Sequence, residues 1–175
     1  RAWLYHWQTM IPAYIDWWER HQGAGYQVAA SELKIERTIY IDGNPLVLKG
    51  RIDRLDQGQR GKVVLDYKTG QVPDPEAIAN GEQCQLGFYT LLLDSVVEAA
   101  MFVGLREPPV KPGPAVSGTE LTELRDHLLA RISAMAKRLS HDAGLPAWGD
   151  RATCARCGYE GLCRKELWTE DDRRQ

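Results

Sequence analysis

Large apolar side chains recur at helical spacing at the beginning of the chain and again in its last third. In residues 1 to about 22 they lie three and four positions apart, which predicts an amphipathic helix. The side chains of this stripe are Trp3, Leu4, Trp7, Ile11, Tyr14, Ile15 and Trp18. The same spacing from Leu121 to Leu139 predicts a second amphipathic helix, which we expect to end near Gly144.

Between these helices the chain alternates apolar and polar residues, which is the pattern of half-buried strands. This pattern predicts three strands, at residues 26–41, 46–55 and 62–68. Turn-forming residues separate the strands at positions 42–45 and 57–61. Because consecutive strands with short connections usually pair with each other, we expect an antiparallel meander.

After the meander the pattern changes to a helix and then back to a strand. Residues 75–93 predict a helix with a break near Gly81, and residues 96–105 predict a fourth strand. Four of the nine prolines lie in residues 107–116, which we therefore expect to form a loop. The order of helix, three strands, helix, strand and helix predicts an α/β (α+β) fold, with a mixed central β-sheet flanked by helices.

The composition is that of one soluble globular domain of 175 residues, with a cysteine-rich tail at 150–165. No apolar run is long enough for a membrane span or a signal peptide, so we expect a cytoplasmic protein. The chain begins at Arg1, inside a predicted helix, so we expect a C-terminal piece of a longer protein. Its net charge of −2 argues against a basic nucleic-acid-binding surface, although a carboxylate-rich metal site is negatively charged by design.

Charged residues gather where the third predicted strand ends. Asp66 and Lys68 lie two positions apart, so their side chains point to the same face of that strand. Asp53 lies on the preceding strand and falls close to opposite Asp66 in a hairpin that turns at 57–61. Two carboxylates this close repel each other unless a cation lies between them, and oxygen ligands suit Mg²⁺ or Mn²⁺. Beside such a cation, Lys68 can orient a water molecule or stabilise charge on phosphoryl oxygens.

Each of these three residues alone is also typical of a solvated charge on a hairpin. Their combination favours a site, because the spacing, the apolar residues that precede Asp66 and the break at Gly70 all agree. The sequence therefore predicts that Asp53, Asp66 and Lys68 form one catalytic cluster.

The segments around these residues resemble a known family of nucleases. Gly-Arg-Ile-Asp53-Arg and Leu-Asp66-Tyr-Lys68-Thr-Gly are similar to the motifs of the PD-(D/E)XK nuclease superfamily. Within that superfamily they resemble the RecB/AddB-type exonuclease domain. The segment Gln85-Leu-Gly-Phe-Tyr89 resembles the QxxxY motif that follows the catalytic lysine in those domains.

The resemblance implies a restriction-endonuclease-like core and a set of site residues. The implied metal ligands are Asp53, Asp66 and the backbone carbonyl of Tyr67. Gln85 would contact the active site or DNA, and Tyr89 would lie near the DNA strand. A helix that packs Tyr89 into the core explains that residue nearly as well.

Two upstream features of the family are matched less well. Glu32 corresponds to an acidic position at the start of the first core strand, where it would assist at the metal site or pair with a nearby base. The family also carries a metal-ligating His on an upstream helix. His6 and His21 lack the Gly-x-x-x-His context of that ligand, so we expect it to precede Arg1. Whether this piece cleaves DNA alone is therefore open.

The implied activity is that of a Mg²⁺- or Mn²⁺-dependent deoxyribonuclease, an exonuclease that hydrolyses phosphodiester bonds. The implied partners are DNA and a helicase subunit or helicase domain, in double-strand break repair and recombination. One alternative keeps the fold without the chemistry, as an inactive nuclease-like module that binds DNA or a helicase. A small zinc-binding interaction protein is a further alternative, for which only the cysteine tail argues.

Three cysteines lie within ten residues near the end of the chain: Cys154, Cys157 and Cys163. Clustered thiolates suit Zn²⁺ or an iron–sulfur cluster, and either group needs a fourth ligand. The pattern resembles the last three ligands of the 4Fe–4S cluster in AddB-like proteins, whose fourth Cys lies far upstream. Cys84 lies on the predicted active-site helix and is not expected to be that ligand. Zinc with His141 as fourth ligand, or reduced cysteines without a metal, are the alternatives.

Overall fold

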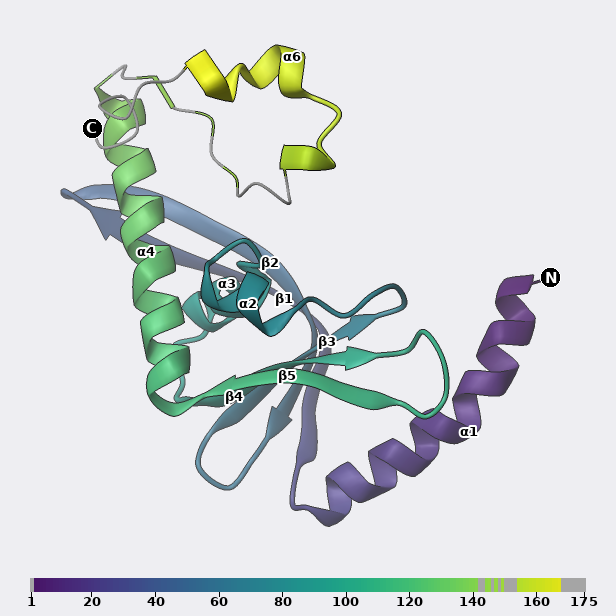
Figure 1. Ribbon diagram of the computed structural model, residues 1–175. Helices are drawn as coiled ribbons and strands as arrows, with labels where there is room; N and C mark the ends of the chain where they lie inside the picture. Colours follow the sequence, from purple (N-terminus) through teal and green to yellow (C-terminus); the bar gives the residue numbers. More distant parts are fainter. Residues whose placement is uncertain (1, 142–143, 146, 148, 150–153, 168–175) are drawn as a thin grey trace. The chain divides into compact units, whose positions relative to one another are not determined.

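The computed structural model of the chain describes residues 2–141, 144–145, 147, 149 and 154–167. It confirms the predicted α+β fold, with a five-stranded mixed sheet and flanking helices (Figure 1). The elements are α1 (Ala2–Gly23), β1 (Gln27–Ile41), β2 (Asn44–Gln57), β3 (Lys62–Lys68), α2 (Pro75–Ala79), α3 (Gln85–Leu92), β4 (Val97–Gly104), β5 (Lys111–Ser117), α4 (Gly118–Ser140), α6 (Glu160–Cys163) and the short 3-10 helix η1 (Lys165–Leu167). The chain divides into two compact units, residues 1–129 and 130–175. Positions 150–153 of the predicted cysteine tail lie outside the described residues.

The sheet has the strand order β1-β2-β3-β4-β5. The first three strands form the predicted antiparallel meander, and β4 pairs with β5 in the same antiparallel way. β3 and β4 are parallel, because the chain between them crosses over through α2 and α3. Gly81, at φ +78°, lies between these two helices, so the predicted break in the helix is confirmed.

The predicted loop at 107–116 is wrong over its second half. Residues Lys111–Ser117 form β5, in which Pro112 lies opposite Val103 of β4. A proline cannot donate to a ladder, but an edge strand has one side that needs no ladder partner. The prolines therefore mark the edge of the sheet as well as the turn that precedes it.

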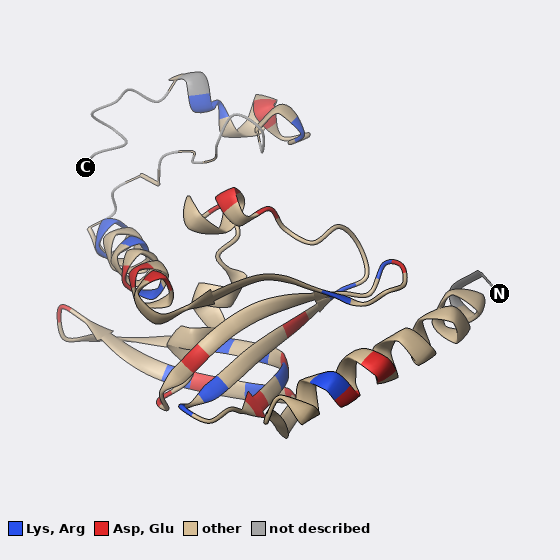
Figure 2. Ribbon diagram, turned by 60° about the horizontal axis from the view of Figure 1, so that its bottom comes forward, with Lys and Arg blue, Asp and Glu red and all other residues tan. Residues whose placement is uncertain are grey.

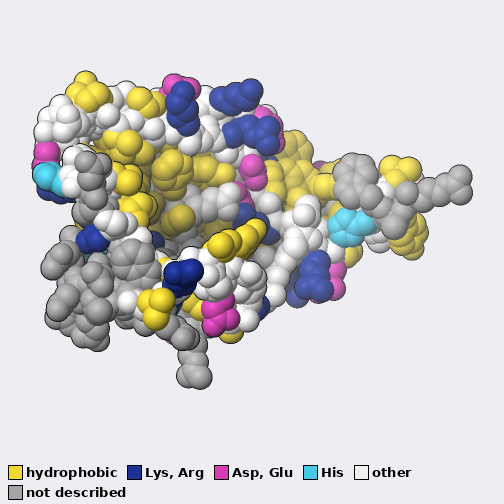
Figure 3. Space-filling model, turned by 90° about the horizontal axis from the view of Figure 1, so that it is seen from above, with side chains coloured by type: hydrophobic (Ala, Val, Ile, Leu, Met, Phe, Trp, Pro, Cys, Tyr) yellow, Lys and Arg dark blue, Asp and Glu magenta, His cyan; other side chains and the backbone are white. Residues whose placement is uncertain are grey.

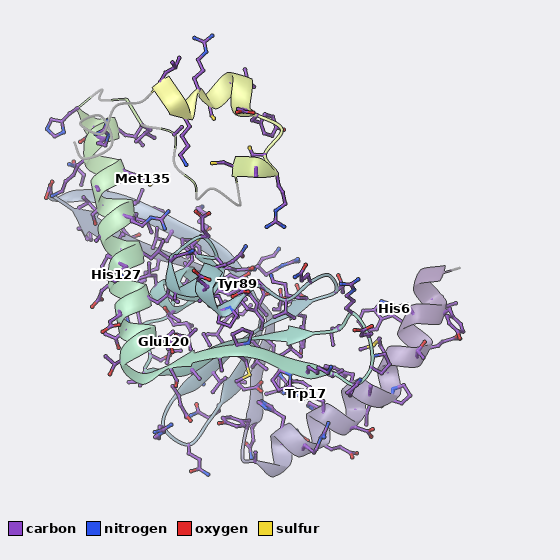
Figure 4. The ribbon with its side chains drawn as sticks, in the orientation of Figure 1. His6, Trp17, Tyr89, Glu120, His127 and Met135 are labelled. Atoms are coloured by element: carbon purple, nitrogen blue, oxygen red, sulfur yellow. The ribbon has the colours of Figure 1, made fainter. Side chains whose placement is uncertain are left out.

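One face of the sheet is covered by α1. Met10 and Trp17 of this helix are buried against Val63, Leu65 and Val103 in a single hydrophobic cluster. Trp17 points from α1 toward the strands in Figure 4. Full burial of an apolar side chain of this size contributes about 1.5–3 kcal/mol. The helix also runs without interruption through Pro12.

The other face of the sheet carries α3, against which the first turns of α4 pack. A side chain at Gly50 of β2 would come within 2.5 Å of Leu92, at the end of α3. A side chain at Gly87 would come within 3.1 Å of Leu124 on α4. Both glycines therefore allow a close approach, and α3 is held tightly between the sheet and α4.

The alternation of side chains between the two faces of the sheet is broken in β2 near Asp53. Gly50 faces α3, whereas Arg54 contacts Tyr14 on α1, although positions four apart on a regular strand share a face. Opposite this point, Glu32 adopts φ +50°, a left-handed conformation that is unusual for a residue with a side chain. The irregularity sets Asp53 at the point where the strand turns over.

A buried cluster of polar side chains joins α1 to the sheet. The guanidinium of Arg54 donates to both carboxylate oxygens of Asp56, at 2.7 and 2.9 Å. His21 of α1 lies 2.8 Å from the same carboxylate and is stacked between Trp17 and Tyr26. Burial alone would raise the pKa of Asp56, but the hydrogen bonds to His21 and Arg54 lower it below its usual value. We call these residues, with Tyr14 and Tyr67, the back-face cluster.

We expect Asp56→Asn to destabilise the protein at neutral pH but much less in acid. The pKa of Asp56 is lower in the folded than in the unfolded chain, so its charge stabilises the fold above the usual pKa of 3.8. That stabilisation disappears as the pH falls through the folded pKa. Loss of one partner of a buried ion pair costs about 3–5 kcal/mol. Urea unfolding across acidic to neutral pH measures the difference.

The exposed carboxylate of Asp94, paired with Arg37 at the surface, supplies the control variant Asp94→Asn. Its free energy of unfolding should change by less than about 1 kcal/mol at any pH. An Asp56→Asn defect that is equally large in acid would show that the effect comes from packing and not from charge.

Candidate active site

Two carboxylates lie close together where the ladder between β2 and β3 ends. The ladder between these strands ends at the pair Arg54 and Leu65, and one more step would set Asp53 opposite Asp66. Instead of continuing the ladder, the carboxylate of Asp53 accepts a hydrogen bond from the backbone N–H of Tyr67 at 3.0 Å. A side chain thus replaces a strand partner at the point where the two strands separate.

Lys68 lies against the carboxylate of Asp66, on the same strand face. Its ammonium nitrogen is 2.5 Å from Asp66 Oδ2, and it donates to Gln85 Oε1 at 2.6 Å. The same nitrogen lies 4.9 Å from the centre of the Phe102 ring, within cation–π distance. The lysine is therefore held by a charge, an amide and an aromatic face, and it has little freedom to move away.

Gln85 connects the acid and the base of this cluster. Its amide nitrogen donates to Asp66 Oδ1 at 2.5 Å and to the hydroxyl of Tyr89 at 2.9 Å. One helical turn separates Gln85 from Tyr89 on α3, which puts both on the side facing the sheet. Tyr89 is 9% exposed and lies between α3 and the strands (Figure 4). Its ring belongs to the core and its hydroxyl to the polar cluster, so the packing and site interpretations of this residue are compatible.

Asp66 is an ionisable group in a buried position, with 1% of its surface exposed. Burial raises its pKa above the usual value, and the nearby charge of Asp53 adds to this effect. Hydrogen bonds from Lys68 and Tyr89 lower the pKa only in part. Asp66 Oδ2 is fully buried and accepts no hydrogen bond of normal geometry, although the Lys68 ammonium is close to it. A divalent cation bound at this oxygen would therefore share it with the Lys68 ammonium.

The oxygen donors of this cluster fit a hard divalent cation. Asp53 and Asp66 supply carboxylates, and Mg²⁺ typically binds one or two carboxylates and keeps several waters. Within the described ranges, no group of three or more His, Cys, Asp or Glu side chains is arranged to hold a metal. A cation here would therefore need backbone oxygen, water or substrate to complete its shell.

Glu32 and the two upstream histidines have other partners. The exposed carboxylate of Glu32 pairs with Arg51 at 3.1 Å, so a supporting role at the metal site stays a prediction. His6 lies 3.0 Å from the carbonyl of Leu105, and His21 belongs to the back-face cluster. Neither histidine extends the pair of carboxylates.

The three tail cysteines belong to the unit of residues 130–175 and are not gathered around a common point. Cys154 accepts a hydrogen bond from the Lys165 ammonium at 3.3 Å, and Cys157 is exposed. Cys163, also exposed, donates to a backbone carbonyl, and His141 contacts the carbonyl of Lys137. As described, these side chains do not fit a preformed metal site, so the iron–sulfur cluster and its zinc alternative stay predictions from the spacing.

The back-face cluster was not predicted from the sequence. Arg54 and Asp56 were assigned no role, and Tyr14 was predicted only as part of the apolar stripe of the first helix. One signal was available, because Arg54 and Asp56 lie two apart on a strand, with Leu55 between them, and therefore point to the same face. Two opposite charges on the buried face of a strand indicate an ion pair in which each charge is the other's hydrogen-bond partner.

Acidic and basic side chains are mixed along the strands, as Figure 2 shows. On the face seen in Figure 3 they are interspersed with hydrophobic side chains, and no patch of one sign dominates that face. None of the helices in the described part of the chain is long and apolar enough to cross a membrane.

The sequence and the fold each have known counterparts. The family model of the PD-(D/E)XK nuclease superfamily matches residues 1–164. The crystal structure of SSO0001 is similar in fold, with a TM-score of 0.50 and 19% sequence identity. The match covers 83% of this chain and 63% of the SSO0001 chain, so this chain spans less than two thirds of that protein. No curated protein matches the sequence.

We expect Asp66→Asn to stabilise the metal-free protein at neutral pH. Because burial raises the pKa of Asp66, the unfolded chain releases this proton more readily than the folded chain does. The penalty is absent below the usual pKa of 3.8 and grows as the pH rises above it. Removing such a strained charge typically gains about 0.5–2 kcal/mol. Thermal unfolding in the presence of a chelator, at acidic and neutral pH, measures the gain.

Asp94→Asn again serves as the control, because Asp94 lies at the surface. Asp74→Asn is not suitable, because the side chain of Asp74 caps α2. An Asp66→Asn protein that is less stable than wild type at neutral pH would contradict the argument.

Proposed function

The chain belongs to the PD-(D/E)XK nuclease superfamily, and from this premise we propose that it is a metal-dependent DNA exonuclease domain. The observation that carries the proposal is the single cluster of Asp53, Asp66, Lys68 and Gln85, which forms where the ladder between β2 and β3 ends and α3 begins. Nucleases of this superfamily typically use Mg²⁺ or Mn²⁺. The two carboxylates have the oxygen donors that such a cation needs.

Asp53, Asp66 and the backbone carbonyl of Tyr67 would hold the cation. When bound, the cation supplies a Lewis acid that polarises the phosphodiester and acidifies water. In the hydrolysis, a bond forms between the water oxygen and phosphorus while the bond from phosphorus to the leaving deoxyribose oxygen breaks. The proton that the water loses passes through solvent to that leaving oxygen, so the products are a phosphate monoester and a hydroxyl. By holding the cation, the two carboxylates would determine the position at which the phosphodiester is hydrolysed.

Lys68 would stabilise the negative charge that develops on the phosphoryl oxygens. A preorganised cationic donor in a partly buried site is effective, because it needs little reorganisation during the reaction. Gln85 keeps the Lys68 ammonium at 2.6 Å from its own oxygen and orients Asp66 with its nitrogen. Tyr89 in turn anchors the Gln85 amide. We assign Gln85 and Tyr89 as positioning residues, with Gln85 also near enough to the cluster to meet substrate.

The finer proposal is a RecB/AddB-like domain that works with a helicase in double-strand break repair and recombination. The Gln85–Tyr89 spacing and the contact of Gln85 with Lys68 support it. The net charge of −2 and the mixed charges also support a partner, because DNA binding depends on neutralising phosphates. A helicase subunit or domain would then supply the basic channel that guides DNA to the site.

One observation favours a second candidate, a nuclease-like module that binds DNA or a helicase without cutting. The described side chains include no group of three metal-ligating residues, and the carboxylate of Glu32 is engaged by Arg51. The intact Asp53, Asp66 and Lys68 argue against this candidate. Cleavage measurements separate the two.

We expect the protein to degrade end-labelled linear DNA with Mg²⁺ or Mn²⁺ and not with a chelator. Lys68→Ala should lower kcat by about 10²–10³-fold, the usual effect of removing one preorganised donor. Lys49→Ala is the matched control, because Lys49 is exposed and pairs with Glu36 at the surface. Covalently closed circles should survive if the activity needs an end.

Absence of metal-dependent cleavage, both for this chain and in the presence of an added helicase partner, would favour the binding module. Cutting of closed circles would refute the exonuclease part of the proposal alone. An undiminished rate for Lys68→Ala would remove this lysine from the mechanism.

A further inference from the structure

The side chain between Asp66 and Lys68 lies on the opposite face of β3 from theirs. Tyr67 alternates with its two neighbours, as strand geometry requires, and its ring contacts Tyr14 of α1. Its hydroxyl is 2.8 Å from the hydroxyl of Tyr14 and accepts from the guanidinium of Arg54 at 3.3 Å. Burial is the largest cause that raises the pKa of this phenol, which therefore stays protonated.

Arg54 is itself firmly placed. It is 4% exposed, donates to both oxygens of Asp56, and lies 5.7 Å from the centre of the Trp17 ring. Asp56 is completely buried and is also bound by His21 of α1. The phenol of Tyr67 is therefore attached to a group whose own position is fixed by Asp56 on the same strand and by the side chains of α1.

The hydrogen bond between this phenol and Arg54 matters because the last residues of β3 form no ladder pairs with β2. The last ladder pair is Arg54 and Leu65, whereas Asp66, Tyr67 and Lys68 still pair with β4 on their other side. Toward β2, two tethers remain for this segment. One is the front tether, from the Tyr67 N–H to Asp53 at 3.0 Å; the other is the back tether, from the Tyr67 hydroxyl to Arg54.

From this arrangement we infer that Tyr67 is a positioning residue for the nuclease site, acting through its hydroxyl. The back tether holds the backbone of Asp66–Lys68 at a fixed distance from β2, which leaves Asp53 free to serve both the Tyr67 N–H and a cation. Without it, the hydrogen bond from the Tyr67 N–H is what restrains this segment toward β2, so the Asp53 carboxylate must hold the segment in place by itself while it also binds a cation. The inference rests on the proposed function for the cation, but the two tethers are independent of it.

The competing explanation is that the back-face cluster only stabilises the fold. Tyr67→Phe removes the hydroxyl and keeps the buried ring, so it separates the two explanations if stability is matched. Val116→Ala is the control variant: Val116 is buried in β5, opposite Ala100 of β4, and touches neither tether. Tyr14→Phe removes one partner of the phenol and leaves the bond to Arg54, so its effect should be smaller.

The first measurement needs no metal. Amide hydrogen exchange, followed residue by residue by NMR, reports whether the N–H of residue 67 is still held by Asp53. In Tyr67→Phe we expect this amide to exchange about tenfold faster relative to those of Val63 and Leu65, which lie within the ladder region. In Val116→Ala the three amides should speed up together, because exchange then reports global stability.

The second measurement is Mn²⁺ binding to the same proteins, followed by the electron paramagnetic resonance signal of the free ion. We expect the dissociation constant of Mn²⁺ to be about three- to tenfold larger for Tyr67→Phe, because the loss of one hydrogen bond typically has an effect of this size. Val116→Ala should bind as wild type does.

The outcomes separate this inference from the proposed function. Unchanged exchange and unchanged Mn²⁺ affinity in Tyr67→Phe would overturn the inference, whether or not the protein cleaves DNA. Equal changes in Tyr67→Phe and Val116→Ala would overturn it too, in favour of a purely structural cluster. Normal Mn²⁺ binding by wild type without cleavage, both alone and with an added helicase partner, would refute the proposed function and leave the positioning role intact.

Discussion

A carboxylate buried without full compensation is the constraint on which this structure depends. Asp66 lies near the end of β3, directly after Val63 to Leu65, which are completely buried, and its own exposure is 1%. Burial raises its pKa, and the Lys68 ammonium does not fully offset that effect. The fold is stable enough to keep this charge in place because both faces of β3 are packed, one by α1 and the other by α3.

The surroundings of Asp66 follow from this constraint. On the front face, Gln85 connects Asp66 to Lys68 and Tyr89, so acid and base are fixed relative to each other. On the back face, an ion pair of Arg54 and Asp56 is fully bonded and holds the strand that carries Asp53. The two faces differ in what they do. The back-face pair is satisfied by its own partners, whereas the front-face carboxylates have capacity left for a cation and substrate.

Much of the fold could be predicted from the sequence, because it is encoded in local patterns. Apolar spacing predicted α1 and the meander, and the turn at 57–61 predicted the register that brings Asp53 toward Asp66. β5 was missed, because prolines signal a loop unless the edge position of the strand is known. The predicted register also did not show that the ladder between β2 and β3 stops one pair early. Nor did it show that the carboxylate of Asp53 then accepts a hydrogen bond from the backbone N–H of Tyr67.

The contacts that complete the site depend on residues far apart in sequence. Gln85 meets Lys68 only because the crossover between β3 and β4 folds α3 back onto the sheet. His21 and Asp56 pair across 35 positions, and no local pattern joins them. The left-handed backbone of Glu32 was likewise invisible in the sequence, since nothing there marks it as a turn. Residue types at fixed spacing thus predicted the chemistry of the site, while its geometry came from tertiary packing.

The central claim is that Asp53 and Asp66 together form the site of a divalent cation. A crystal structure of the protein soaked with Mn²⁺, with anomalous scattering used to locate the metal, tests this claim most directly. We predict an anomalous peak between the two carboxylates, at about 2.1 Å from an oxygen of each, as expected for a small hard cation. A saturated crystal with no peak there, or with Mn²⁺ bound only at other residues, would contradict the claim.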